Sequence, residues 1–210
     1  MSDDRRAGLD GALGVFGGTF DPIHVAHLAV AEGVRDALGL RRVLFVPAAT
    51  APHKTDRPVS PGADRLAMVR LAIADNAAFE ASPIELEREG LSYTIDTLRA
   101  LTAAAHAAGD DPRLALILSA EAYADFATWR DPDAIRALAT LVVVPRDGYP
   151  DVAPEPGMVV LDGPRVRLSA SELRSRARAG RSLRYLVPDA VAAYIGDHGL
   201  YQDHRRDETR

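Results

Sequence analysis

The feature that most constrains the fold is a set of continuous apolar runs separated by longer helical patterns. Four runs are rich in Val, Ile and Leu: residues 13–16 (LGVF), 42–47 (RVLFVP), 114–119 (LALILS) and 140–145 (TLVVVP). Their apolar residues follow one another without polar alternation, which is typical of strands buried on both faces of a parallel sheet. The segment MVVLDG at 158–163 indicates one further strand.

Helical patterns separate these strands. They cover residues 25–38, 62–74, 94–107, 120–126, 171–179 and 189–198. The alternation predicts an α/β fold with a Rossmann-like, doubly wound parallel sheet and a helical C-terminal portion. The sequence contains no internal repeat and no low-complexity linker. We therefore expect a single domain over residues 11–201, with disordered ends at 1–10 and 202–210.

Composition narrows the classes of function. The chain has no cysteine, so any chemistry must use His, carboxylate, hydroxyl, Lys or Arg groups. Its formal net charge of −5 gives no global electrostatic support for binding nucleic acid. No apolar stretch approaches the ~20 residues needed to span a bilayer, and the N-terminus is too polar for a signal peptide. We expect a soluble, cytoplasmic protein with no nucleic-acid or membrane partner.

The loop after the first apolar run, GVFGGTFDPIHVAHL at 14–28, is the first place to look for a ligand, because ligands of such sheets bind at the carboxyl ends of strands. Its glycine spacing fits neither the dinucleotide fingerprint nor a P-loop. Gly17 and Gly18 would still let the backbone approach a ligand closely and adopt positive φ. The helix that follows would offer free N–H groups to an anion.

Two histidines, His24 and His27, open this helix on one face, because they lie three residues apart. A cation at a helix N-terminus opposes the helix dipole, so the imidazoles should be neutral unless a bound anion compensates them. We rank phosphate binding first and ordinary capping or packing second. A zinc site ranks third, because Asp21 is the only nearby candidate for a further ligand.

A second motif, LSASELR at 168–174, follows the last predicted strand. Ser169 and Glu172 have the spacing of a capping box, with Ser169 as the N-cap of a helix. Capping does not explain Arg174, which gains nothing from the dipole so near a helix start. A polyphosphate there would pair with Arg174, the serine hydroxyls and the free N–H groups.

The segment GGTFDPIHVAH at 17–27 resembles the signature of nucleotidyltransferases of the adenylyltransferase superfamily, with Ala26 in place of the commoner glycine. The resemblance implies a nucleotidyltransferase fold in which both histidines face the phosphates of ATP. The segment at 168–174 is similar to the superfamily's second phosphate-binding motif, with Ala170 and Ser171 replacing Ser and Thr. Together these matches imply ATP contacts from Gly17, Gly18, Thr19, Phe20, His24, His27, Ser169, Ser171 and Arg174.

Further segments resemble the nicotinate-nucleotide adenylyltransferase family, and the resemblance spans residues 15–201. They are VPAATAPHK at 46–54, SYTIDTL at 92–98, FATWRDP at 126–132, VVVPRDGYP at 142–150 and the ending at 180–201. Core packing could equally explain Trp129, and an amphipathic helix could explain the ending. The resemblance assigns the acceptor to Asp21, Lys54, Tyr93, Thr94, Trp129 and Arg146.

The family would transfer AMP from ATP to nicotinate mononucleotide, releasing pyrophosphate. The residues expected to carry catalysis are His24, His27, Lys54 and Arg174. Mg²⁺ should arrive on the ATP phosphates, and we expect no metal held by the protein itself. The sequence leaves the oligomeric state open, and a homodimer is compatible with it.

One segment departs from the family pattern. Ser119, Ala120 and Glu121 stand where Gly-Ala-Asp usually contacts the ribose of the nucleotide. We expect Glu121 to accept hydrogen bonds from the ribose all the same. Two alternatives stay open: an acceptor such as phosphopantetheine or nicotinamide mononucleotide, or a nucleotide-binding protein without turnover. The SYT and Trp129 matches argue more strongly against phosphopantetheine than against the nicotinamide nucleotide.

Overall fold

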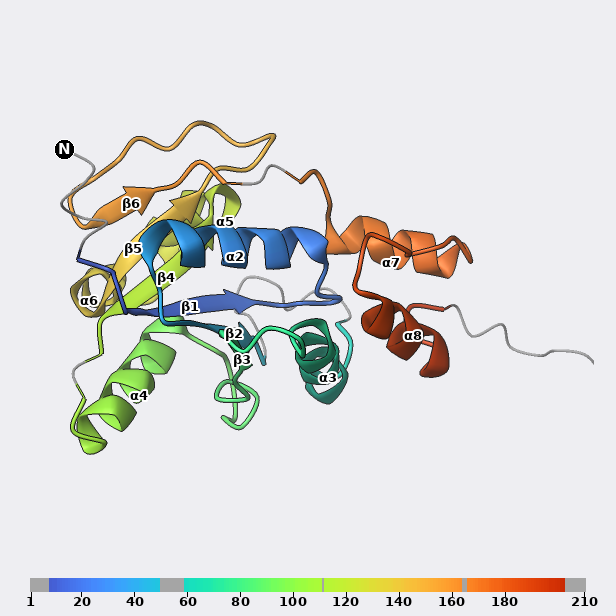
Figure 1. Cartoon of the computed structure of the whole chain (residues 1–210), viewed down its shortest axis with the longest axis horizontal. Helices are drawn as coiled ribbons and strands as arrows, with labels where there is room; N and C mark the ends of the chain where they lie inside the picture. The colour runs from blue at the N-terminus through green and yellow to red at the C-terminus, as the bar shows by residue number, and fades with distance from the viewer. Residues whose placement is uncertain (1–7, 50–58, 111, 164–165, 203–210) are drawn as a thin grey trace, which may run out of the picture.

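The computed structural model describes residues 8–49, 59–110, 112–163 and 166–202. Six parallel strands form one sheet in the order β3-β2-β1-β4-β5-β6 (Figure 1). The strands are β1 (Leu13–Gly18), β2 (Arg42–Pro47), β3 (Phe79–Ala81), β4 (Leu114–Ser119), β5 (Ala139–Val144) and β6 (Met158–Val160). The helices are α2 (Val25–Leu38), α3 (Gly62–Ala72), α4 (Thr94–Ala107), α5 (Ala120–Ala124), η1 (Phe126–Thr128), α6 (Pro132–Leu138), α7 (Ala170–Arg178) and α8 (Asp189–Asp197).

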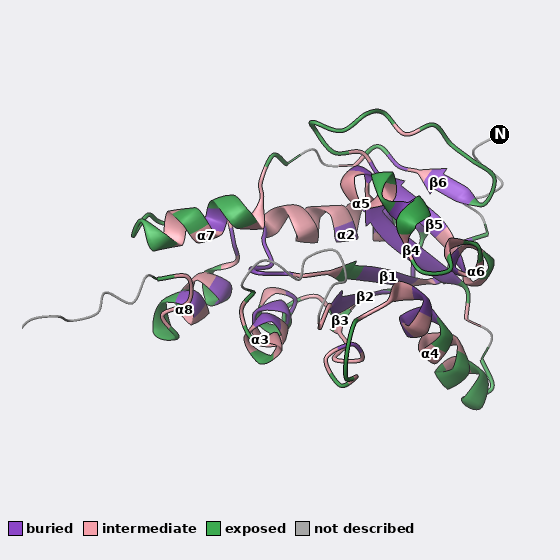
Figure 2. Cartoon of the chain, turned by 180° about the vertical axis from the view of Figure 1, so that it is seen from behind, coloured by how far each residue is buried: buried purple, intermediate pink, exposed green. Residues whose placement is uncertain are grey.

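Both faces of the sheet are covered, which explains the continuous apolar runs. In β1, Phe16 belongs to a core that also includes residues of α2, α3, α7 and α8. Its neighbour Val15 belongs to a second core on the other face, with residues of α4 and α6. Successive residues of β2, β4 and β5 divide between the two cores in the same way. Figure 2 shows buried strands between helices, with exposed surfaces on α4 and α7 and intermediate burial along most of α2.

The strand order reverses between β1 and β4. Pairing between these two strands ends at Val15 and Leu116, whereas β1 stays paired with β2 as far as Gly18 and Pro47. The carboxyl half of β1 is therefore paired along one edge only. Ligands of doubly wound sheets bind at such a reversal point.

The doubly wound fold predicted from the sequence is confirmed, with differences at short elements. The sequence analysis missed β3, which has only three residues at the sheet edge. It also missed α6, although the signal was present: Asp131 caps the helix by accepting from Ala134 N–H, and Pro132 occupies its first turn. The strand at β6 ends at Val160 rather than at Gly163, because only three of its residues pair with β5.

The packed part of the chain begins before the expected domain start at Gly11. Leu9 is 3% exposed and belongs to the core. The Arg113 guanidinium donates to the carbonyl oxygens of Gly8, at 3.1 Å, and Asp10, at 2.6 Å. Residues 8–10 are thus held against the amino end of β4. Among the described residues, no helix is long and apolar enough to cross a membrane.

Candidate active site

The loop between β1 and α2 turns at Phe20, not at the glycines. Phe20 has a φ of 50°, whereas neither Gly17 nor Gly18 has the positive φ that the sequence analysis expected. Gly18 is required for a different reason, because a Cβ there would lie 2.9 Å from the Phe20 ring. Nothing lies within 4 Å of a Cβ placed on Gly17, so its exposed backbone borders open space.

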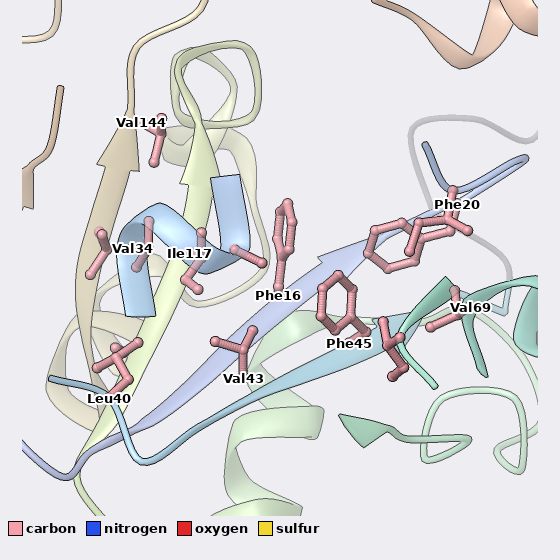
Figure 3. Close-up of a cluster of buried hydrophobic side chains, with 14 of the residues drawn as sticks. Phe16, Phe20, Val34, Leu40, Val43, Phe45, Val69, Ile117 and Val144 are labelled. Carbon is pink, nitrogen blue, oxygen red and sulfur yellow. The ribbon is translucent and has the colours of Figure 1, made fainter. Parts of the chain in front are cut away.

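An aromatic cluster holds this loop in place. The buried ring of Phe20 lies 5.7 Å from that of Phe16 and 5.8 Å from that of Phe45, centroid to centroid (Figure 3). The His27 ring meets Phe20 edge to face at 5.1 Å. These contacts fix the turn of the loop and the orientation of His27 together.

His24 and His27 form a stacked pair, with ring centroids 3.7 Å apart and an angle of 19° between the planes. The backbone N–H of His24 donates to His27 Nδ1 at 3.2 Å. The neutral ring of His27 must then carry its proton on Nε2. Both imidazoles therefore lie at the N-terminus of α2, with His24 as the N-cap and His27 in a capping-box arrangement with it, so the capping role ranked second from the sequence is present and phosphate binding stays a prediction.

His24 is buried and uncharged at neutral pH. Burial, together with the positive charge of Arg146, lowers the pKa of His24 to about 4. Its Nδ1 atom has no hydrogen-bond partner among the residues that the structure describes. The N–H of His27 bonds instead to the carbonyl oxygen of His24, at 2.9 Å. A buried polar atom without a partner indicates an unfilled interaction at this site.

Asp21 is a structural anchor of the loop. Its carboxylate accepts the Tyr201 hydroxyl at 2.6 Å on one oxygen and the Ser60 N–H at 3.2 Å on the other. Burial and Asp21 raise the pKa of Tyr201 above its usual range. Because Asp21 is 3% exposed and both oxygens bond within the protein, its predicted contact with the acceptor does not fit this geometry.

The start of α7 lies against the same loop, although it is far away in the sequence. Arg174 Nη1 donates to the carbonyl oxygen of Asp21 at 2.7 Å, and Nη2 donates to Ser171 Oγ at 3.2 Å. Ser169 caps the helix, as predicted, by accepting the Glu172 N–H at 3.2 Å. The start of α7, with Ser169, Ser171 and Arg174, thereby lies against the loop that leads to the histidine pair, and the Asp21 carbonyl oxygen is a structural partner of Arg174 that helix electrostatics did not supply.

Glu121 and Arg146 are paired with each other across the ends of β4 and β5. The sequence analysis assigned Glu121 to the ribose of ATP and Arg146 to the acceptor, and it did not foresee this ion pair. Ser119 caps α5 by accepting the Ala122 N–H at 3.2 Å, so its hydroxyl is used locally. The positive charge of Arg146 also contributes, after burial, to the lowered pKa of His24.

The start of α4 and the Trp129 segment lie side by side. Tyr93 is the N-cap of α4, and its side chain makes no capping hydrogen bond. The Arg130 guanidinium lies 4.7 Å from the centre of the Tyr93 ring and 3.6 Å from the Asp96 carboxylate. Trp129 is half-buried against Phe126, with ring centroids 5.5 Å apart. Arg130, which follows Trp129 in the sequence, thus brings this segment against the start of α4, and the predicted contacts of Tyr93, Thr94 and Trp129 with the acceptor stay predictions.

Arg65 is a residue of this region that the sequence analysis missed. It is 2% exposed, and its guanidinium donates to the carbonyl oxygens of Thr19 at 2.8 Å, Ser60 at 2.9 Å and Ala49 at 3.3 Å. It thus joins the loops after β1 and β2 to the segment before α3. No motif marks it, because an isolated arginine in a helical pattern normally faces solvent.

Lys54 lies outside the described residues, so its predicted role stays a prediction. In the part of the chain that the structure describes, no three or more His, Cys, Asp or Glu residues gather in a way that could hold a metal ion.

Comparisons with known proteins first define a class. The family described as cytidylyltransferase-like matches residues 15–176, a range that holds the histidine pair and Arg174. A Roseiflexus sp. protein named "Probable nicotinate-nucleotide adenylyltransferase" is 48% identical over 200 residues, covering 90% of this chain and 98% of the relative. A Thermus thermophilus protein of the same name is 47% identical over 191 residues, covering 90% and 99%. The chain belongs to the nicotinate-nucleotide adenylyltransferase family.

A solved structure agrees on the fold. It is that of Plasmodium falciparum nicotinic acid mononucleotide adenylyltransferase complexed with NaAD, with a TM-score of 0.75 over 90% of this chain and 97% of that one. Its sequence identity of 16% limits this comparison to the arrangement of helices and strands.

Proposed function

We propose that this chain transfers AMP from Mg-ATP to nicotinate mononucleotide, giving nicotinate adenine dinucleotide and pyrophosphate. The observation that carries the proposal is the stacked histidine pair at the start of α2, at the reversal point of the sheet, with Arg174 and Arg146 nearby. Neutral imidazoles, guanidinium groups and helix N–H groups together suit a polyphosphate. Family membership supports the choice of acceptor.

The reaction needs little acid–base chemistry from the protein. A phosphate oxygen of the mononucleotide attacks the α-phosphorus of ATP, and the bond between that phosphorus and the bridging oxygen to the β-phosphate breaks. The bonding electrons leave with pyrophosphate. Since the second pKa of a phosphate monoester is ~6, the nucleophile is already largely a dianion at neutral pH. Catalysis then consists of aligning both phosphates and stabilising the developing charge.

Different residues of the site would bind different phosphate groups of ATP. His27, with its proton on Nε2, would donate a hydrogen bond to the phosphates, and neutral His24 would line the same position. Arg174 would pair with the β- and γ-phosphates without leaving the loop that it supports. Mg²⁺ prefers oxygen ligands, whereas this site offers nitrogen donors, so the ion would enter as part of the Mg-ATP substrate.

The acceptor would bind between the start of α4 and Trp129. The N–H groups of the first turn of α4 suit the carboxylate of the nicotinate ring, since the side chain of Tyr93 does not cap them. Trp129 would stack on the ring itself.

Pyrophosphate release tests the proposal directly. The purified chain would be given Mg-ATP with nicotinate mononucleotide, nicotinamide mononucleotide or phosphopantetheine in separate reactions. We expect the fastest release with the nicotinate nucleotide. ATP binding without pyrophosphate release in the presence of any of the three acceptors would identify a nucleotide-binding protein without turnover. Faster release with phosphopantetheine would show that phosphopantetheine, not the nicotinate nucleotide, is the acceptor.

A further inference from the structure

A buried carboxylate outside the site described above has no role in the proposed chemistry. Glu85 lies between β3 and α4 and is 7% exposed, and burial raises the pKa of its carboxyl group. Thr97, in the first turns of α4, donates its hydroxyl to Glu85 Oε1 at 2.7 Å. Burying a carboxylate is unfavourable in free energy unless the group forms hydrogen bonds. The hydrogen-bond partners of Glu85 therefore indicate which parts of the fold it stabilises.

Two hydroxyl groups converge on Glu85. Arg88 Nη2 donates to Thr97 Oγ1 at 2.6 Å, and the Thr97 hydroxyl in turn donates a hydrogen bond to Glu85. On the other side, the N–H of Ala49 donates to Ser92 Oγ at 3.1 Å, and hydrogen bonding by the Ser92 side chain lowers the pKa of Glu85 against the larger, opposite effect of burial. A hydroxyl has one hydrogen to give. The Thr97 hydroxyl accepts from Arg88 and donates to Glu85, and the Ser92 hydroxyl accepts from Ala49, so Glu85 is the acceptor available to the hydrogen that each hydroxyl has left.

The two residues that carry these hydroxyl groups, Ser92 and Thr97, lie on either side of the start of α4. Ser92 precedes the N-cap Tyr93, and Thr97 follows it by one helical turn. Ala49 belongs to the loop after β2, and its carbonyl oxygen accepts from Arg65, which also holds the first loop through Thr19. Glu85 therefore fixes the start of α4 relative to the loops after β1 and β2. The loop after β1, with the histidine pair, and the start of α7, with Arg174, form the phosphate side of the site.

We propose that Glu85 is a positioning residue for acceptor recognition, setting the direction of the first N–H groups of α4 through Ser92 and Thr97. The proposal rests on the proposed function and names the part of the fold that orients the acid-recognising groups. Glu85 contacts neither the histidine pair nor Arg174 in the described structure. Its removal should thus disturb the acceptor and leave ATP binding nearly unchanged.

The test is Glu85→Gln, which keeps the shape of the side chain. The amide has one acceptor oxygen in place of two, so at least one hydroxyl loses its acceptor. We expect the KM for nicotinate mononucleotide to rise about 10-fold, while the KM for Mg-ATP stays within about 2-fold of the original. The preference for the acid over the amide nucleotide should fall by a similar factor. Glu87→Gln is the matched control, because Glu87 is the exposed glutamate two residues further on, and it should change neither constant.

Variants that remove one of the two hydroxyl groups distinguish a positioning role of Glu85 from a general loss of protein stability. Ser92→Ala and Thr97→Val each remove one hydroxyl, and each should raise the acceptor KM less than Glu85→Gln does. Adding Ser92→Ala to Glu85→Gln should give less than the sum of the two effects, because both act through one network. If Glu85→Gln does not fold, Ser92→Ala carries the same comparison of KM values.

Three outcomes would overturn the proposal. Equal changes in both KM values would show a general structural role, and unchanged acceptor kinetics in folded Glu85→Gln would show no role in recognition. Absence of turnover by the unaltered chain would overturn the proposed function and this inference with it, whereas normal turnover with an unaffected variant would overturn this inference alone.

Discussion

The two sides of the candidate site are held in different ways. On the phosphate side, the loop after β1 is fixed by contacts from distant parts of the chain: Tyr201 binds the Asp21 carboxylate across 180 residues, and Arg174 binds its backbone across 153. Arg65 adds a third, buried contact through Thr19. On the acceptor side, buried Glu85 holds the start of α4 from within through Thr97, whereas the outer side chains are joined by the ion pairs Glu121–Arg146, Arg130–Asp96 and Arg99–Asp131, which are 36–58% exposed.

The phosphate side is therefore formed before a substrate binds, whereas the exposed side chains of the acceptor side can change position when a substrate binds. Hydrogen bonds to charged groups contribute about 1.5–3 kcal/mol each, whereas exposed ion pairs contribute about 0–1 kcal/mol. A nucleotide entering the phosphate side meets groups that are already in place. A ligand that displaces Arg146 from Glu121 loses little, so the exposed side chains of the acceptor side can rearrange around a substrate while the start of α4 stays fixed.

The largest effect is expected at His27. His27→Ala should lower kcat by about 100-fold or more while Mg-ATP still binds, because a donor fixed toward the phosphates acts mainly in the transition state. Steady-state kinetics, with ATP affinity measured separately, would check this. His106→Ala, which removes an exposed histidine of α4, serves as the control. Near-normal turnover by His27→Ala would end its assignment as a phosphate donor.

The neutrality of His24 predicts a pH dependence of stability. The pKa of His24 is about 4 in the folded protein, against about 6.5 when unfolded. Between these values the unfolded chain binds a proton that the folded chain does not, so stability falls as the pH drops. The loss should be about 2 kcal/mol between pH 7 and pH 5.

Urea unfolding at the two pH values would measure this loss, and His24→Asn should remove most of it. An unchanged pH dependence in the variant would mean that His24 is not the buried neutral group that the phosphate side requires.

A smaller loss is expected at Arg174. Arg174→Ala should raise the KM for Mg-ATP or lower kcat by roughly 10-fold, the order expected when one charge-assisted contact to phosphate is lost. Arg174→Lys should restore only part of this, since an ammonium group cannot bond to Asp21, Ser171 and a phosphate as a guanidinium fork can. Ser171→Ala keeps the contact with Asp21 and should have a weaker effect. Unaltered KM and kcat in Arg174→Ala would remove Arg174 from the site.

The sequence predicted the parts of the site that depend on local patterns. The buried runs at 42–47 and 114–119 and the helix at 25–38 follow from apolar periodicity, and the Ser169 cap follows from its spacing. The spacing of His24 and His27 also predicted that they lie close together, although His24 is the N-cap of α2, with extended backbone, rather than a residue of the helix. Such features involve residues a few positions apart, and the regular geometry of a helix or strand determines which of these residues are neighbours.

The parts that could not be predicted depend on tertiary contacts. Nothing near Asp21 in the sequence shows that Tyr201 occupies its carboxylate, and nothing near Arg65 shows that three carbonyl oxygens surround it. Resemblance assigned Glu121 and Arg146 to two different ligands, but only the strand order placed β4 beside β5 and made the two residues partners.

The smallest expected effect concerns the choice between nicotinate and nicotinamide mononucleotides. They differ in one group, a carboxylate or a neutral amide. The N–H groups at the start of α4 favour the carboxylate through hydrogen bonds and the helix dipole, whereas the amide sets one of its own donors against them. We expect kcat/KM to favour the acid by about 10-fold or more. Trp129→Ala should weaken both acceptors and leave their ratio nearly unchanged, because stacking does not distinguish the two rings. Parallel kinetics on both nucleotides would decide this, and equal efficiency or a preference for the amide would show that the acceptor side does not recognise the acid through α4.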